Sequence, residues 1–144
     1  MKENTTVAAE LTLTDAQQVL EAALGKADGI GQPMNVAVVD AGGHLLAFAR
    51  QEGAILGSID IAIRKARTAA LLKMTTAALG EAAAPGAPLY GIEVTNGGLV
   101  IFGGGIPLTR GSDNAVIGAI GVSAGTVDQD MTVADAGVAA LPMG

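Results

Sequence analysis

The feature that most constrains the fold is a pair of short apolar runs separated by a glycine-rich turn. Residues 35–40 read NVAVVD and residues 44–50 read HLLAFAR. The turn between them contains Gly42 and Gly43, and glycine is the residue that tight turns favour. Strands joined this closely along the chain pair in antiparallel fashion, so we expect a β-hairpin. Strand alternation predicts one face made of His44, Leu46, Phe48 and Arg50.

Helix signals lie on both sides of this hairpin. A capping box at residues 14–17 predicts a helix over about residues 14–29, and a second box at residues 126–129 predicts a C-terminal helix. Apolar residues recurring every three to four positions predict another helix over about residues 57–73. Residues 81–98 are rich in proline and glycine, and we interpret them as a long connection of the kind that often carries function.

Three further short strands are expected, at residues 99–102, 106–110 and 115–123. Pro107 has no backbone N–H to donate, so its strand should lie at a sheet edge or contain a bulge. Sequential hairpins between terminal helices predict an α+β domain built on an antiparallel sheet. At 144 residues the chain is the length of one domain, and we expect a flexible segment at residues 1–10 before a single domain at residues 11–144.

The composition limits the possible partners. The net charge of −6 opposes binding to phosphate backbones and to anionic membrane surfaces, and the 2% of aromatic residues offer few rings on which bases could stack. We therefore expect a small molecule or a protein as partner, and neither nucleic acid nor membrane. Glycine and alanine contribute 21 and 28 residues, so bulky core side chains are scarce. This scarcity suggests that apolar surface is also buried between subunits of a homo-oligomer.

Several classes of site and location are excluded or disfavoured. The chain has no cysteine, which rules out disulfides, thiolate nucleophiles and metal–thiolate centres. Its polar first residues do not resemble a secretory signal, and the charge-free stretch at residues 114–127 is shorter than the roughly 18 residues of a membrane span. We expect a cytoplasmic protein. The glycine clusters at 103–105 and 118–125 match no nucleotide-binding motif, so no nucleotide cofactor is expected.

The candidate site residues fall into three groups. His44 is the only histidine, and it could be a general base, a haem ligand or a structural turn residue. Arg64 and Arg67, with Asp60, could clamp a carboxylate, or could form an ordinary solvated ion pair with a neighbour. The long connection contributes three more polar candidates, which could ligate iron, move a proton or orient a substrate: Tyr90, Glu93 and Asn96.

Several blocks of the sequence, in one order, resemble the GlcG/HbpS family over about residues 11–142. This family includes haem-binding HbpS-like proteins, GlcG proteins of glycolate operons and the C-terminal domain of PduO. The blocks that carry the resemblance lie at residues 35–45, 57–62, 65–69, 90–93, 97–105, 117–123 and 129–130.

The resemblance implies a profilin-like fold with a five-stranded antiparallel sheet flanked by helices. It also implies homo-oligomers, often octamers, and haem or tetrapyrrole binding. In a haem-binding protein, His44 would be the first candidate ligand of the iron, with Tyr90, a methionine or no protein ligand as competing expectations, and basic residues would hold the propionates. The second hypothesis is a cofactor-free enzyme of the isomerase, lyase or hydrolase type acting on a small oxygenated or carboxylated metabolite. There Glu93 or His44 would transfer a proton and an arginine would hold the anion.

Overall fold

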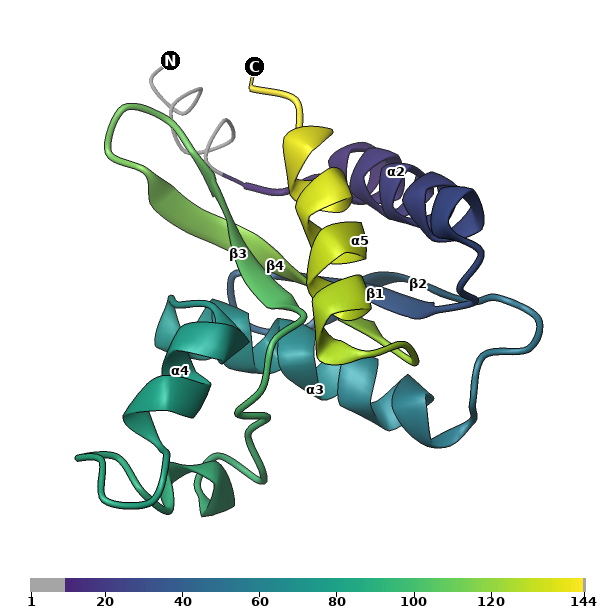
Figure 1. The fold of residues 1–144 in the computed structure, drawn as a ribbon. Helices are drawn as coiled ribbons and strands as arrows, with labels where there is room; N and C mark the ends of the chain where they lie inside the picture. The colour runs from purple at the N-terminus through teal and green to yellow at the C-terminus, as the bar shows by residue number, and fades with distance from the viewer. Residues whose placement is uncertain (1–9, 144) are drawn as a thin grey trace.

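The structure is a computed structural model that describes residues 10–143, so residues 1–9 of the expected flexible segment lie outside the described residues. Figure 1 shows the arrangement of the elements. In chain order these are α2 (Leu13–Ile30), β1 (Asn35–Asp40), β2 (Leu45–Arg50), α3 (Gly57–Leu72), α4 (Thr76–Ala82), the 3₁₀ helix η1 (Ile92–Val94), β3 (Gly105–Arg110), β4 (Ala115–Ser123) and α5 (Val127–Ala139).

The described strands form one antiparallel sheet in the order β2-β1-β4-β3. Helices α2 and α5 cover one face of the sheet and α3 covers the other (Figure 1). The predicted α+β class with an antiparallel sheet flanked by helices is therefore confirmed. Pro107 lies on the edge strand β3, whose pairing with β4 shifts register one residue further on, between Leu108 and Thr109.

The predicted fifth strand is wrong, because the described sheet has four strands and residues 99–102 are not among them. This segment bonds to α3 instead, where the backbone N–H of Val100 donates to Oγ1 of Thr68 at 3.1 Å. The first residue of β3 is tied to a helix in the same way, because the N–H of Gly105 donates to Oγ1 of Thr76 on α4 at 2.9 Å.

One predicted helix needs correction, and another helix was not predicted. The first begins at Leu13 with Thr12 as its N-cap, not Thr14: the N–H of Asp15 donates to Oγ1 of Thr12 at 3.0 Å, and the Asp15 carboxylate accepts from the N–H of Thr12 at 3.3 Å. Sequence spacing fits both threonines, and the tertiary bond from Arg110 to Asp15 favours the earlier one. Helix α4 lies mostly before the predicted connection and was not expected. The C-terminal capping box at Thr126 is confirmed.

The hairpin contains a bulge that changes which side chains share a face. Val38 pairs with Ala47 but Val39 pairs with Leu45, so Leu46 is an extra residue on β2. Leu46 packs with the α2 and α5 side of the core, whereas Phe48 packs on the α3 side. The predicted common face of Leu46 and Phe48 is therefore wrong.

Small residues let α3 lie very close to the sheet. A Cβ atom at Gly121 of β4 would collide with the backbone of α3 at Ala62 and Ala66, so only glycine fits there. Alanines 62, 66, 69 and 70 form the buried stripe of the helix against β1 and β4. This close seating leaves the longer side chains of α3 to reach out along its flanks. Among residues 10–143, no helix is long and apolar enough to cross a membrane.

Candidate functional site

Three of the predicted site residues meet in one shallow hollow of about 290 Å³ beside α3. We call it the arginine hollow and define it by its lining residues: Asp60, Ile63, Arg64, Arg67, Asn96 and Gly97. The first four lie on one flank of α3, and the last two belong to the turn at residues 96–98 that follows η1. Spacings of three and four residues place the helix contributions side by side.

Arg64 makes several contacts to its surroundings. Its Nε–H donates to Oδ2 of Asp60 at 2.8 Å, one helical turn earlier. Its Nη1 donates to the carbonyl of Gly97 at 2.6 Å and to that of Gly98 at 3.3 Å. Arg64 therefore ties a carboxylate of α3 and two backbone carbonyls of the turn to one guanidinium.

Arg67 makes fewer contacts. Its Nη1 donates to the carbonyl of Asn96 at 2.7 Å, and among residues 10–143 no carboxylate pairs with it. The turn presents its carbonyls to both arginines because Asn96, Gly97 and Gly98 all have positive φ, of 54°, 72° and 110°. Glycine adopts such backbone at little cost, which explains the Asn-Gly-Gly sequence at this position.

The remaining predicted residues of the connection, Tyr90 and Glu93, do not line this hollow. Glu93, on η1, accepts the N–H of Leu99 with its backbone carbonyl at 2.9 Å. Its side-chain Oε1 is buried without a hydrogen-bond partner in the described structure. Tyr90 is 68% exposed. The structure therefore brings together Arg64, Arg67 and Asn96, and leaves Tyr90 and Glu93 outside the hollow.

His44 stands at the end of the hairpin with its side chain 82% exposed. Its Nδ1 lies 3.3 Å from Oδ1 of Asp40, which also accepts the N–H groups of Gly42 and His44. The neighbouring Gly43 packs directly against the aliphatic stem of Arg67. The hairpin end thus adjoins the arginine hollow. Because of the bulge, Leu46 and Phe48 lie on opposite faces of the sheet and do not form a common apolar surface beside His44.

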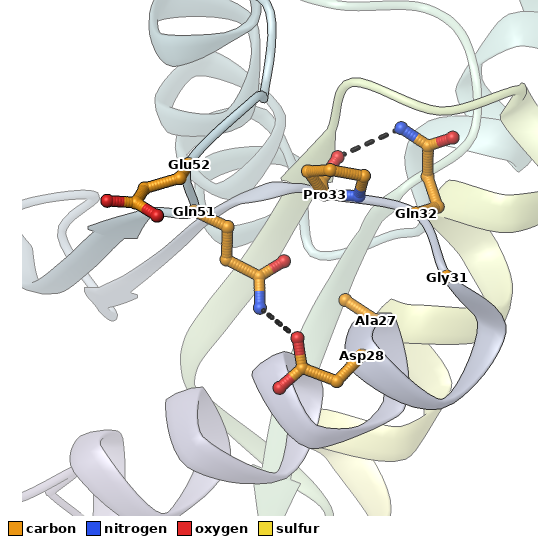
Figure 2. Close-up of a pocket in the computed structure, with 7 residues that line it drawn as sticks. All are labelled: Ala27, Asp28, Gly31, Gln32, Pro33, Gln51 and Glu52. Carbon is orange, nitrogen blue, oxygen red and sulfur yellow. Dashed lines mark hydrogen bonds between the residues drawn. The ribbon is translucent and has the colours of Figure 1, made fainter.

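Larger hollows lie elsewhere on the described surface, and two of them adjoin the ends of the β1–β2 hairpin. One, of about 460 Å³, lies between the end of α2 and the residues around Pro33 and Gln51 (Figure 2). Its amide side chains are already bonded, since Gln51 donates to Asp28 at 3.1 Å and Gln32 to the carbonyl of Pro33 at 3.0 Å. The other, of about 440 Å³, borders the hairpin turn and has apolar walls that include Leu11, Leu46 and Ile117.

A buried ion pair on the other flank of α3 was not predicted from the sequence. Lys65 is fully buried, and its Nζ donates to Oδ2 of Asp130 and to the carbonyl of Val122, both at 2.8 Å. The ammonium also lies 4.9 Å from the centre of the Phe102 ring. Burial lowers the pKa of Lys65 and raises the pKa of Asp130, while the bond between them opposes both shifts. With no exposed surface, Lys65 stabilises the junction of α3, β4 and α5.

Taken together, these observations define a small α+β domain with an open surface hollow lined by two arginines. Among residues 10–143, no group of three or more His, Asp or Glu side chains is placed to hold a metal ion. A family model described as "Haem degrading protein HbpS-like" matches residues 11–139. The chain belongs to this HbpS-like family, and the resemblance seen in the sequence is confirmed.

Individual relatives support the assignment. The chain is 43% identical over 128 residues to an uncharacterized 15.0 kDa protein of Citrobacter freundii, covering 88% of this chain and 89% of that protein. It is 40% identical over 144 residues to the corrinoid adenosyltransferase PduO of Salmonella typhimurium, covering 99% of this chain but 42% of PduO. Among solved structures, the crystal structure of a PduOC:heme complex superposes with a TM-score of 0.86 at 38% identity, covering 94% of this chain and 97% of that one.

Proposed function

We propose that this protein binds haem, or a closely related tetrapyrrole, beside the arginine hollow. The observation that carries the proposal is the likeness to the PduOC:heme complex, which extends over 94% of the chain. The chain spans only 42% of PduO, so the corrinoid adenosyltransferase activity that the name of PduO states is not part of the proposal.

The residues at the hairpin end fit a haem group. Asp40 lies against Nδ1 of His44, which leaves the other ring nitrogen, Nε2, without a partner in the described structure, on a largely exposed side chain. A carboxylate partner of this kind orients a ligating histidine and raises its basicity. Arg67 lies next to the same hairpin through its contact with Gly43, and arginine suits propionate carboxylates.

In this proposal each residue has one task. His44 offers Nε2 to the iron, Asp40 holds the imidazole ring, and the arginine hollow holds a propionate. Bound haem would supply an iron centre whose reactivity the ligand and its surroundings tune. The 68% exposed Tyr90 is the competing ligand.

Haemin titration followed at the Soret band tests the proposal. We expect saturable binding to the wild type near one haem per subunit or per subunit pair. The His44→Ala variant should bind more weakly and show a changed spectrum, whereas Tyr90→Phe should resemble the wild type. Identical spectra and affinities for wild type and His44→Ala would remove His44 as ligand, and absence of saturable binding to the wild type would refute haem binding.

We also propose that the protein forms a closed homo-oligomer, for which the family resemblance suggests an octamer. Large apolar side chains remain exposed on the single chain, among them Ile55, Leu56 and Val94 at 63%, 67% and 81%. Burying such surface between copies would stabilise an assembly. Light scattering coupled to size exclusion should give a multiple of 14.2 kDa, and a monodisperse monomer at micromolar concentration would contradict the assembly.

The buried, unpartnered Oε1 of Glu93 favours a second candidate function, a cofactor-free enzyme that transfers a proton on a small carboxylated metabolite. An unsatisfied buried carboxylate oxygen is costly, and such groups occur at catalytic sites. Glu93→Gln and Arg67→Ala would each abolish turnover of such a substrate. If a panel of small hydroxy and keto acids shows neither turnover nor binding, this second function fails.

A further inference from the structure

The two arginines of the hollow differ in how many of their N–H groups are already used. A guanidinium has one N–H at Nε and two at each Nη, and it binds a carboxylate best through two parallel N–H groups. Such a pair is available on the side edge, formed by Nε and Nη2, or on the end, formed by Nη1 and Nη2. Counting the bonds of Arg64 and Arg67 therefore shows which one can receive a ligand.

Arg64 has no free edge. Asp60 takes its Nε–H at 2.8 Å, and the carbonyls of Gly97 and Gly98 take its Nη1 at 2.6 and 3.3 Å. Only Nη2 remains unused in the described structure. A carboxylate could bind Arg64 through two N–H groups only by displacing Asp60 or the turn.

Arg67 has a complete free edge. Its one hydrogen bond within residues 10–143 goes from Nη1 to the carbonyl of Asn96 at 2.7 Å, which leaves both Nε and Nη2 without a protein partner. The same bond, together with the packing of its stem against Gly43, limits the orientations of the guanidinium. Its side edge is therefore both unoccupied and preorganised for a planar anion.

We propose that Arg67 alone binds a single carboxylate of the ligand, through Nε and Nη2, and that Arg64 is a positioning residue. Arg64 holds the turn at residues 96–98, and the turn in turn holds Arg67 through the carbonyl of Asn96. This inference rests on the proposed function and refines it, because it assigns the carboxylate to one arginine and predicts that only one propionate is held in the hollow.

A comparison of two porphyrins tests the assignment. Haemin and its dimethyl ester differ only in their carboxylates, so the ratio of their affinities isolates the carboxylate contact from any effect of a mutation on folding. For the wild type we expect haemin to bind about tenfold more tightly than the ester. In Arg67→Gln the ratio should fall to about one. In the matched control Arg64→Gln the ratio should persist, even where both affinities fall.

Arg64 should show its positioning role in amide hydrogen exchange. In Arg64→Gln the N–H groups of Gly98 and Leu99 should exchange faster, because the carbonyls of Gly97 and Gly98 lose their bonds to α3. In Arg67→Gln, which keeps those two bonds, exchange should change less. If Arg64→Gln abolishes the preference for haemin and Arg67→Gln retains it, the assignment is reversed and the proposal fails.

A small carboxylate keeps this test separate from haem binding. Sodium propionate, titrated into arginine-labelled protein, should shift the Nε–H resonance of Arg67 saturably and leave that of Arg64 in place. If the wild type binds neither porphyrin but propionate still shifts Arg67 alone, haem binding fails and the carboxylate site stands. If propionate shifts neither arginine, or Arg64 first, the carboxylate site fails while haem binding through His44 is judged by its own titration.

Discussion

Arg64 and Lys65 are consecutive residues of α3, yet they point into opposite environments. Both cations bind one carboxylate and backbone carbonyl oxygen. Lys65 binds Asp130 and Val122 with its side chain fully buried, whereas Arg64 binds Asp60 and the turn at residues 96–98 with its side chain 40% exposed. The same kinds of bonds therefore hold a buried junction on one flank of the helix and line an open, solvent-exposed hollow on the other.

The difference in burial decides what each cation can do. A buried ion pair cannot exchange partners without leaving an uncompensated charge in the interior, so Lys65 serves structure. An exposed guanidinium can exchange a protein partner for water or a ligand at little cost. Proximity in sequence and similarity of bonding are thus poor guides to function, and solvent access separates the two roles.

Breaking the buried pair should have the largest effect on stability. Lys65→Met leaves the Asp130 carboxylate buried without its cation, which should cost about 3–5 kcal/mol of unfolding free energy in urea titrations. The double variant Lys65→Met/Asp130→Leu removes both charges and should recover most of that loss. A loss below about 1 kcal/mol in Lys65→Met would contradict the structural role assigned to this flank.

Glycines beside the two cations give the next comparison. A Cβ at Gly104 would collide with Nζ of Lys65 and with the carbonyl of Val122, whereas a Cβ at Gly98 would meet only the guanidinium of Arg64. Both glycines have positive φ, of 128° and 110°, so alanine is strained at either position. We expect Gly98→Ala to cost about 1–2 kcal/mol and Gly104→Ala more than about 3 kcal/mol, measured by urea unfolding. Equal losses would show that backbone strain alone determines both.

Much of the fold was predictable because it depends on local patterns. The hairpin turn, the apolar period of α3 and the capping box of α5 each involve residues a few positions apart, and all three are confirmed. The errors arose where a distant partner decides between local alternatives. Arg110 favours Thr12 over Thr14 as the cap of α2, and the Thr68 side chain binds the backbone of the segment predicted as a fifth strand.

The candidate site was predictable in part for the same reason. In a helix, the spacing of three residues puts Arg64 and Arg67 on one flank, and the intervening Lys65 falls on the other. Sequence spacing alone could not show that Asn96 faces these arginines, since their contact joins residues 29 positions apart through a backbone carbonyl. Nor could it show that Lys65 reaches Asp130, 65 positions away. Such pairings depend on how the connection and α5 pack around α3.

A third ion pair, between Asp15 and Arg110, is intermediate in burial between the other two. It extends the comparison because its contribution to stability depends on pH. Burial alone would raise the pKa of Asp15, but hydrogen bonds from Thr12 and Arg110 hold it below its ordinary value. A lowered pKa stabilises the folded state above the unfolded-state pKa of about 4, and this stability is lost as pH falls through the folded-state value. Asp15→Asn should cost about 1 kcal/mol at neutral pH, with the difference from wild type shrinking below about pH 4 in urea titrations. A difference that is constant from neutral to acidic pH would contradict the ion pair.

The exposed pair should have the smallest effect on stability and the more informative effect on binding. Asp60 is 70% exposed, so Asp60→Ala should change the unfolding free energy by less than about 0.5 kcal/mol. The same change releases Nε of Arg64 and gives that arginine a free side edge like that of Arg67. Propionate should then shift the Nε–H resonances of both arginines, and haemin should bind several-fold more tightly than to the wild type.

The control Glu21→Ala removes one exposed carboxylate from α2 and should leave both readouts unchanged. If Glu21→Ala strengthens binding as much as Asp60→Ala does, net charge and not the freed edge accounts for the gain.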